Sequence, residues 1–310
     1  MTTELSTRAH ESKKQMANSI TYTDGSVKES VLNLISIINP DETQLLNGLQ
    51  RTRALGPVHQ WLVQDISAVD STNAGNVEGA SLGTATTTDP VRQTNYTQIF
   101  KRVWGVSGTQ KAASHYAKDA KARAMDEAMR VIGNDMEFAL MRGTTAGAGS
   151  SSTARTLRGV KSWITTNVTA GSAAAFTQTI LDGALQGVYT AGGKVDSIYM
   201  NGTIKRKVDA FTGNTRNINA EQNKVVSAVN VYESSFGTVR IYLHRYVTYT
   251  GDTNNDVVGL DSKRWGIAVL RDPKNVDIAT TFDGDSGAII GELTLESRNE
   301  KSSFKLTNYT

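Results

Sequence analysis

The chain has 310 residues, of which 38% are hydrophobic, so it is long enough to build a sizeable core and two subdomains. Its 33 Lys and Arg residues against 30 Asp and Glu residues give a net charge of +3, and no strongly basic segment indicates a dedicated nucleic-acid binder. The absence of cysteine excludes disulfide frameworks, cysteine-ligated zinc and thiol nucleophiles.

The first 51 residues are predicted to form an N-terminal arm with short helices. Residues 1–27 are polar and mixed in charge, which is typical of an extended terminal segment, and they lack the apolar stretch of a signal peptide. An apolar element at 30–38 ends before Pro40, and Asp41 can cap a second short helix. No run of about 18 apolar residues follows anywhere in the sequence, so we expect no membrane span.

Residues 52–108 are predicted to form a long two-stranded arm. The segments 58–66 and 96–106 are rich in β-branched and aromatic residues, as strands are, and a polar run of Gly, Ala, Ser and Thr separates them. A ribbon of two strands is marginally stable alone in water. We therefore expect the arm to lie across a neighbouring copy of the chain, which indicates assembly rather than chemistry.

A long helix is predicted at 117–142. Met129, Ile132, Met136 and Leu140 belong to a broad apolar stripe at helical spacing, while Lys121 is expected to be solvated. At about 1.5 Å per residue the helix would be on the order of 40 Å long. A glycine-rich break at 143–152 follows it.

The remaining sequence divides into two patterns. Residues 159–235 alternate between helix and strand, with a helix at 176–191, a buried strand at 196–201 and a basic helix after it, which indicates an α/β subdomain. From 236 to 310 the chain is dominated by strands, which we expect to return and pack on the long helix as an antiparallel sheet. The predicted class is α+β.

One motif carries possible chemistry. Residues 284–287 read GDSG, as in the nucleophile signature of serine proteases, and His59 precedes them. However, Ala288 replaces the usual following glycine, and His59 lacks the small-residue surroundings of such a base. A polar turn is the favoured interpretation of Ser286, and a serine hydrolase stays open as an alternative.

Other patterns give no site. The glycine-rich break has no Gly-Lys-Ser/Thr sequence and therefore lacks the lysine of a phosphate loop. Asp252, Asn254 and Asp256 have the spacing of calcium ligands, but Val257 replaces the turn glycine and no final Glu follows. The histidines are scattered, and the basic run at 205–207 is expected to be a solvated helix face. The four histidines are His10, His59, His115 and His244. We predict no catalytic, cofactor-binding or metal-binding residue in this chain.

The order of these elements resembles that of the major capsid proteins of tailed bacteriophages, which have the Hong Kong 97-type fold. More narrowly, six segments look like the phage capsid family that includes the major head protein of enterobacterial phages of the SU-ten type. These segments are NYTQIFKRVWGVSGTQKAA (95–113), NDMEFALMRG (134–143), RGVKSWITTN (158–167), YMNGTIKRKVDAFTG (199–213), VNVYESSFGTV (229–239) and ELTLESRNEKS (292–302). The resemblance runs from about residue 28 to the C-terminus.

The resemblance implies a major capsid protein that assembles in the host bacterial cytoplasm into the pentamers and hexamers of an icosahedral virion shell around double-stranded DNA. It implies contacts with a portal protein, with packaged DNA at the inner surface and, in some relatives, with scaffold or decoration proteins. The implied domains are an N-terminal arm and short helices (1–51), an E-loop hairpin arm over the adjacent subunit (52–108), a peripheral domain with the spine helix (109–158), an axial α/β domain (159–235) and strands that return to the peripheral domain (236–310).

Two matters stay open at this level. Some relatives cross-link a Lys to an Asn through a Glu, and Lys101, Asn299 and Glu300 are conceivable in those roles, although no motif assigns them. The chain lacks the long helical N-terminal segment that some relatives carry as a fused scaffold, which leaves scaffolding and maturation cleavage open. An encapsulin-like compartment shell is the main alternative to the virion shell.

Overall fold

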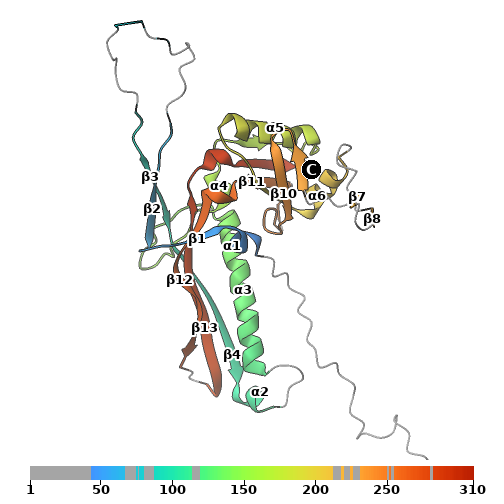
Figure 1. The fold of residues 1–310 in the computed structure, drawn as a ribbon. Coiled ribbons are helices and arrows are strands. Elements are labelled where there is room, and N and C mark those ends of the chain that lie inside the picture. Colours follow the sequence, from blue (N-terminus) through green and yellow to red (C-terminus); the bar gives the residue numbers. More distant parts are fainter. Residues whose placement is uncertain are drawn as a thin grey trace, which may run out of the picture.

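The computed structural model describes residues 43–66, 75, 77–79, 87–113, 119–211, 218–219, 224–225, 231–249, 251–252, 255–279 and 282–310. Figure 1 shows an elongated subunit with a narrow β arm, a long helix with long strands beside it, and a compact sheet flanked by helices. Helices and strands are thus segregated, and the predicted α+β class is confirmed. The elements expected at 1–27 and 30–38, and most of the tip of the arm, lie outside the described residues.

The long helix α3, Ala120–Arg142, packs along a four-stranded sheet. Ile132, Met136 and Leu140 recur at four-residue spacing and are at most 1% exposed, so these members of the predicted stripe do face the core. Strand β13 is antiparallel to both of its neighbours, β12 and β4, and β1 is parallel to β12. The order across the sheet is β1 (Gln50–Arg53), β12 (Trp265–Ile278), β13 (Gly284–Ser297) and β4 (Gln98–Ser107).

Two glycines permit close approach around this helix. A Cβ on Gly291 of β13 would lie 2.7 Å from the Cε atom of Met136, so a larger residue here would require the end of the Met136 side chain to move. At the end of α3, a Cβ on Gly143 would lie 2.6 Å from the carbonyl oxygen of Leu157. The glycine-rich break therefore begins with a position that is fixed by packing.

Two positions of α3 differ from the prediction. Met129 is 44% exposed, so its place on the buried stripe was wrong. The buried face of α3 is instead marked by Ala128, Ile132, Met136 and Leu140, which lie one position before Met129 and at four-residue spacing from there. Lys121 is not simply solvated either, because its Nζ atom lies 3.4 Å from Asp285 and 5.5 Å from the ring centroid of Trp104.

A six-stranded sheet forms the compact part of the subunit. Its central strand β6, Ser197–Met200, is buried at every position, as the sequence predicted for this segment. Helix α5, Gln178–Thr190, buries Leu181, Leu185 and Val188 in the same core. The order across the sheet is β5 (Val168–Ala170), β14 (Phe304–Tyr309), β11 (Asn255–Leu260), β6, β10 (Gly237–Leu243) and β9 (Val231–Ser234).

The strands after residue 236 do not all return to the long helix, as the sequence had led us to expect. Strands β10, β11 and β14 belong to the six-stranded sheet. Only β12 and β13 belong to the four-stranded sheet, and of these two it is β13 that packs on α3. The reason is visible in the pairing, because β6 is fully buried and needs a neighbour on each side, which β10 and β11 provide. One cluster of buried apolar residues lies between α3 and the four-stranded sheet and extends to Tyr199, Val258 and Leu260 of the six-stranded sheet. The second cluster joins the six-stranded sheet to α5 and α6.

The arm is the antiparallel ribbon of β2, Val58–Val63, and β3, Val91–Tyr96. The predicted second strand at 96–106 was wrong, because most of that segment is β4 of the four-stranded sheet. The chain passes from arm to body at Thr97, whose N–H donates to the carbonyl of Pro57 over 2.9 Å. Beyond it, Phe100 and Trp104 are buried in the core that α3 shares.

The remaining elements are short. No helix among the described residues is long and apolar enough to cross a membrane. These elements are α2 (Gly108–Ala112), α4 (Val160–Trp163), α6 (Gly202–Asp209), β7 (Ile218–Asn219), β8 (Lys224–Val225) and the 3-10 turns at Ser262–Arg264 and Glu300–Ser302.

Candidate assembly site at the base of the hairpin arm

Asn95 of β3 fixes the base of the arm to the body. Its side chain is fully buried, and its Nδ2 atom donates to the carbonyl oxygens of Arg158, at 3.0 Å, and Leu295, at 2.8 Å. Its Oδ1 atom accepts from the N–H groups of Arg158 and Tyr96. Because both ends of the amide are bonded, any other side chain would leave buried polar groups without partners. Asn95 thus joins the arm to β13 and to the segment before α4.

The partner strand carries a second polar contact. His59, directly across from Asn95, places its Nε2 atom 3.4 Å from Oε2 of Glu296 on β13. The Nε atom of Arg298 donates to the other carboxylate oxygen over 2.8 Å. The hydrogen bond with His59 is the largest cause that lowers the pKa of Glu296 to about 2, Arg298 lowers it further, and burial opposes both. Glu296 is therefore ionised at neutral pH.

Aromatic rings complete the contact between arm and body. The Nε1 atom of Trp61 donates to the carbonyl of Ser297 over 2.7 Å, and its ring centroid lies 5.5 Å from that of Trp163. The guanidinium of Arg158 lies 4.4 Å from the Trp163 centroid, in the range of a cation–π contact. His59 and Trp61 share one face of β2, so this whole face is committed to the body.

Glu292 of β13 holds the point where the arm joins β4. Its carboxylate is 4% exposed, accepts the Thr97 hydroxyl over 2.6 Å and lies 3.1 Å from Nε of Arg271. Arg155 binds the same carboxylate oxygen as Thr97. Two guanidinium groups thus compensate one buried charge, which keeps the desolvation cost of the carboxylate tolerable. Glu292 and Glu296 are four residues apart on β13. Because side chains at even spacing in a strand share a face, both lie on the side of the sheet that carries the arm.

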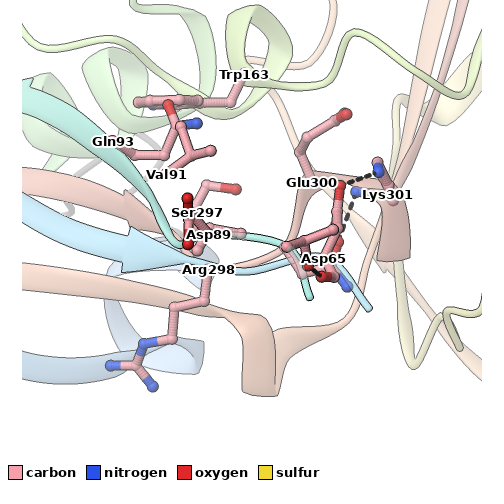
Figure 2. A pocket seen from close by; sticks show the side chains of 12 residues that line it. Asp65, Asp89, Val91, Gln93, Trp163, Ser297, Arg298, Glu300 and Lys301 are labelled. Carbon is pink, nitrogen blue, oxygen red and sulfur yellow. Dashed lines mark hydrogen bonds and ion pairs between the residues drawn. The ribbon is translucent and has the colours of Figure 1, made fainter. Parts of the chain in front are cut away.

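A cavity of about 380 Å³ lies beside the anchored base of the arm, and Figure 2 shows its lining. Its walls come from the end of β2, the start of β3 and the residues next to them at 65 and 88–89, from Trp163 and from the segment at 297–301. Lys301 reaches Asp65 at 2.7 Å across one side of it. Glu300 accepts the backbone N–H groups of Thr165 and Thr166. Lys301 therefore helps to hold the arm to the body, whereas Glu300 joins two segments of the body.

The opposite face of the arm is apolar and uncovered. Val58 and Leu62 point away from the body and are 49% and 66% exposed, and Leu55 beside the arm is 92% exposed. A second apolar strip lies on the outer face of the four-stranded sheet, where Val103 and Val276 flank Ala288 in one cross-strand row. Val103 is 61% exposed. Apolar surfaces of this kind indicate contact with other protein surfaces.

The structure separates the residues of the hydrolase alternative. Ser286 and Glu296 both lie on β13 ten positions apart, which is about 30 Å at about 3.3 Å per residue. His59 binds at the Glu296 end, so it cannot accept a proton from Ser286. The Ser286 hydroxyl instead faces the carbonyl of Ile278 across the β12–β13 pair, at 3.4 Å. The polar turn predicted around Ser286 was also wrong, because Ser286 is part of strand β13.

The other candidate residues have structural partners. Arg142 binds Asp252 through two hydrogen bonds, and Lys161 binds Asp256. Both carboxylates are therefore paired with cations of the protein and do not form a calcium site. Lys205, expected in a solvated face, is buried and pairs with Asp209 at 2.6 Å. Asn254, His10 and His115 lie outside the described residues.

The proposed cross-linking residues do not meet within one subunit. Lys101 pairs across the sheet with Ile290, whereas Asn299 and Glu300 follow the far end of β13. The side chain of Asn299 accepts the N–H of Lys301. Within the described part of the chain, no group of three His, Asp or Glu residues is arranged to hold a metal ion.

Sequence reasoning did not single out Asn95, Glu292 or Glu296. A signal was present in GELTLES at 291–297, where polar and apolar residues alternate strictly in a strand. Such alternation normally predicts a solvated polar face. Here that face is covered by the arm, and the polar groups bind it.

The family of the chain follows from comparison of its sequence. The model of the SU10 major capsid protein family matches residues 11–310. The chain belongs to this family. The resemblance to this family that was inferred from the sequence is confirmed.

A curated relative agrees with this assignment over part of its length. The major capsid protein of Escherichia phage Phieco32 is 25% identical over 125 residues. That match covers 40% of this chain and 35% of the relative, so the chain spans about a third of the length of that curated relative.

Solved structures share the fold at low identity. The capsid of a native GTA particle has a TM-score of 0.65 and 13% identity, and the match covers 95% of this chain and all of the other. A structure from Mycobacterium phage Adephagia has a TM-score of 0.64 and 12% identity, covering 92% and 95%. The holo-SrpI encapsulin complex from Synechococcus elongatus PCC 7942 has a TM-score of 0.57 and 11% identity, covering 91% and 92%. The predicted Hong Kong 97-type capsid fold is confirmed.

Proposed function

We propose that the chain builds the icosahedral shell of a phage head by laying the outward face of its arm on the sheet of the next copy. The outward face carries Val58 and Leu62. The receiving strip is the row described above, in which Val103 and Val276 flank Ala288, and these four valine and leucine side chains are exposed in the single subunit. Each buried square ångström of apolar surface would contribute about 25 cal/mol, so the two faces together favour association.

The observation that carries this proposal is the contrast between the two faces of β2. His59 and Trp61 are bound to the body, while Val58 and Leu62, in alternation with them, have no covering element among the described residues. An arm that is anchored on one face and apolar on the other is prepared for a partner. Rigid anchoring also lowers the entropic cost of binding, since little of the arm must be ordered on contact.

The domain division is part of the proposal. Strands β2 and β3 would be the E-loop, α3 with β1, β4, β12 and β13 would be the peripheral domain, and the six-stranded sheet with α5 and α6 would be the axial domain. This division differs from the linear one at residue 235, because β10, β11 and β14 join the axial part. Pentamers and hexamers would form around the axial domains.

The partners and location follow from a virion shell. We infer packaged double-stranded DNA at the inner surface, a portal protein at one vertex, assembly in the host cytoplasm, and scaffold or decoration proteins as optional partners. The proposed role is purely structural, with no catalytic step and no cofactor. The separation of Ser286 from His59 by about 30 Å supports this part of the proposal.

A pair of matched substitutions on the arm tests the proposal. Leu62→Ser removes apolar surface, and Gln60→Ser removes polar surface from the neighbouring position of the same exposed face. We expect Leu62→Ser to give folded subunits that assemble poorly and Gln60→Ser to give normal shells, seen by gel filtration and negative-stain microscopy. Normal shells from Leu62→Ser would contradict the docking role of the arm.

The contents of purified particles separate the virion from a compartment shell. Particles that are purified from infected cells should protect double-stranded DNA from added nuclease. Protein cargo without such DNA would favour the encapsulin-like alternative, which shares the fold at 11% identity.

A further inference from the structure

A second cavity, of about 290 Å³, has a strongly basic lining. It lies where the end of α3, the short helix α4 and strand β14 meet. Its volume is several times the share of about 30 Å³ that a water molecule takes in the liquid. The lining residues are Arg142, Gly143, Thr144, Lys161, Ser162, Lys305 and Thr307.

Two of the three cations in this lining already have anionic partners behind them. Arg142 holds Asp252 through hydrogen bonds of 2.6 Å and 3.1 Å. Lys161 is paired with Asp256 and also donates to the carbonyl of Val247 over 3.1 Å. These pairs fix the two cationic groups in place beside the cavity and neutralise two of its three positive charges.

Lys305 is the cation without a counter-charge. Among the described residues, its Nζ atom has one hydrogen-bond partner, the carbonyl oxygen of Lys161 at 2.7 Å, and no carboxylate within ion-pair distance. Burial is the main cause that lowers the pKa of Lys305, and the charges of Lys161 and Arg158 lower it further while Asp256 opposes them. An ammonium has three donors, so Lys305 retains donors for a ligand.

We propose that this cavity binds a phosphate group against Lys305 and Lys161. An oxyanion there would supply the missing negative charge and accept charge-assisted hydrogen bonds, which are about twice as strong as neutral ones. Lys305 and Lys161 would act as point charges, and the threonines of the lining offer hydroxyl groups at the rim. The inference concerns a site away from the arm and does not depend on the proposed docking of the arm.

The phosphate group has two possible sources with the same chemistry. One is the free inorganic ion, and the other is a phosphodiester of nucleic acid. Both would be recognised by the same ammonium groups, and a competition experiment distinguishes them.

Thermal unfolding of the full-length chain tests the site. The probe is inorganic phosphate, compared with chloride at equal ionic strength, for the natural protein, Lys305→Gln and Lys263→Gln. Lys263 is a matched control because it is an exposed lysine of the 3-10 turn Ser262–Arg264 and does not line the cavity. Phosphate at tenfold above its Kd should raise the Tm of the natural protein and of Lys263→Gln by about 3 °C.

Lys305→Gln should lose most of this shift while it folds normally in chloride. An equal shift in all three proteins, or no shift beyond that in chloride, would overturn the proposal. If Lys305→Gln does not fold, the test is ³¹P NMR of inorganic phosphate with the natural protein. Broadening of the phosphate line that sulfate reverses, and that chloride does not reverse, would support the site. Absence of broadening would overturn it. Displacement of phosphate by a short DNA duplex would identify the phosphodiester as the source, and failure to displace it would identify the free ion.

Discussion

Glu137 of α3 and His244, which follows β10, form a fully buried pair with 2.8 Å between Oε1 and Nε2. The N–H of Tyr246 donates to Nδ1 of His244 over 3.2 Å, so Nε2 carries the proton that binds Glu137. The same carboxylate accepts the N–H groups of Leu45, at 2.7 Å, and Leu46, at 2.9 Å. One side chain therefore joins α1, the long helix and the six-stranded sheet.

Glu137→Gln should destabilise the subunit. The N–H groups of Leu45 and Leu46 bind different oxygens of Glu137, and an amide has only one oxygen, so one of these groups would lose its acceptor at a buried side chain. We expect the free energy of unfolding to fall by about 2 kcal/mol, as measured by urea denaturation. Glu127→Gln, at an exposed position of the same helix, serves as the control. Equal midpoints for both variants would show that the buried network contributes little.

Ile132→Asp should prevent soluble expression, whereas Met129→Asp should be tolerated. Ile132 is 1% exposed in the core between α3 and the sheet, where an unpaired charge costs several kcal/mol, comparable to the whole stability of a domain of about 5–15 kcal/mol. Met129 is 44% exposed, so a carboxylate there stays hydrated. Soluble yield and circular dichroism measure both outcomes. A folded, soluble Ile132→Asp variant would refute the packing of this face.

The stability of the subunit should depend on Glu296 in acid. Because the pKa of Glu296 is lowered to about 2 in the folded state, its contribution is fully present above its unfolded pKa of about 4.5 and is lost as the pH falls toward 2. Glu296→Gln should therefore flatten the fall in Tm between pH 5 and pH 3. Glu233→Gln, at an exposed position of β9, should leave the fall unchanged. An identical pH profile for Glu296→Gln and the natural protein would contradict the assignment.

Ser286→Ala should change neither particle yield nor the length of the chain. A nucleophilic serine needs a base within about 3 Å, and the Ser286 hydroxyl faces a strand carbonyl. A fluorophosphonate probe should not label the natural protein. Labelling that disappears in the alanine variant would revive the hydrolase alternative.

The parts of the fold that follow from hydrophobic pattern could be predicted from the sequence. Helices α3 and α5 and strand β6 were expected close to their observed places, because apolar period and burial agree in each. Strand β3 was missed because VRQTNY is polar, and its side chains bind the body instead of packing in a core. The pairing between strands that are distant in sequence could not be predicted either. Nothing in the sequences of β14 and β11 indicates that they belong to the same sheet as β6.

The anchoring site could not be predicted for a related reason. The contacts by which Asn95, Glu292 and Glu296 join the arm to the body link residues that are far apart in sequence. Asn95 and Leu295, for example, are 200 residues apart. Local sequence carries no record of such partners. Only the alternation in GELTLES indicated a polar face, and the structure was required to show what covers it.

Strand β13 carries both the anchor of the arm, at Glu292 and Glu296, and the apolar row at Ala288, within one unbroken element of 14 residues. The angle between the arm and the strip that would receive a neighbouring arm is thus fixed within a single subunit. In a shell of the proposed kind, this internal angle sets the curvature between adjacent copies. A substitution at Asn95 would then alter the diameter of the particles without touching any surface at which the copies meet.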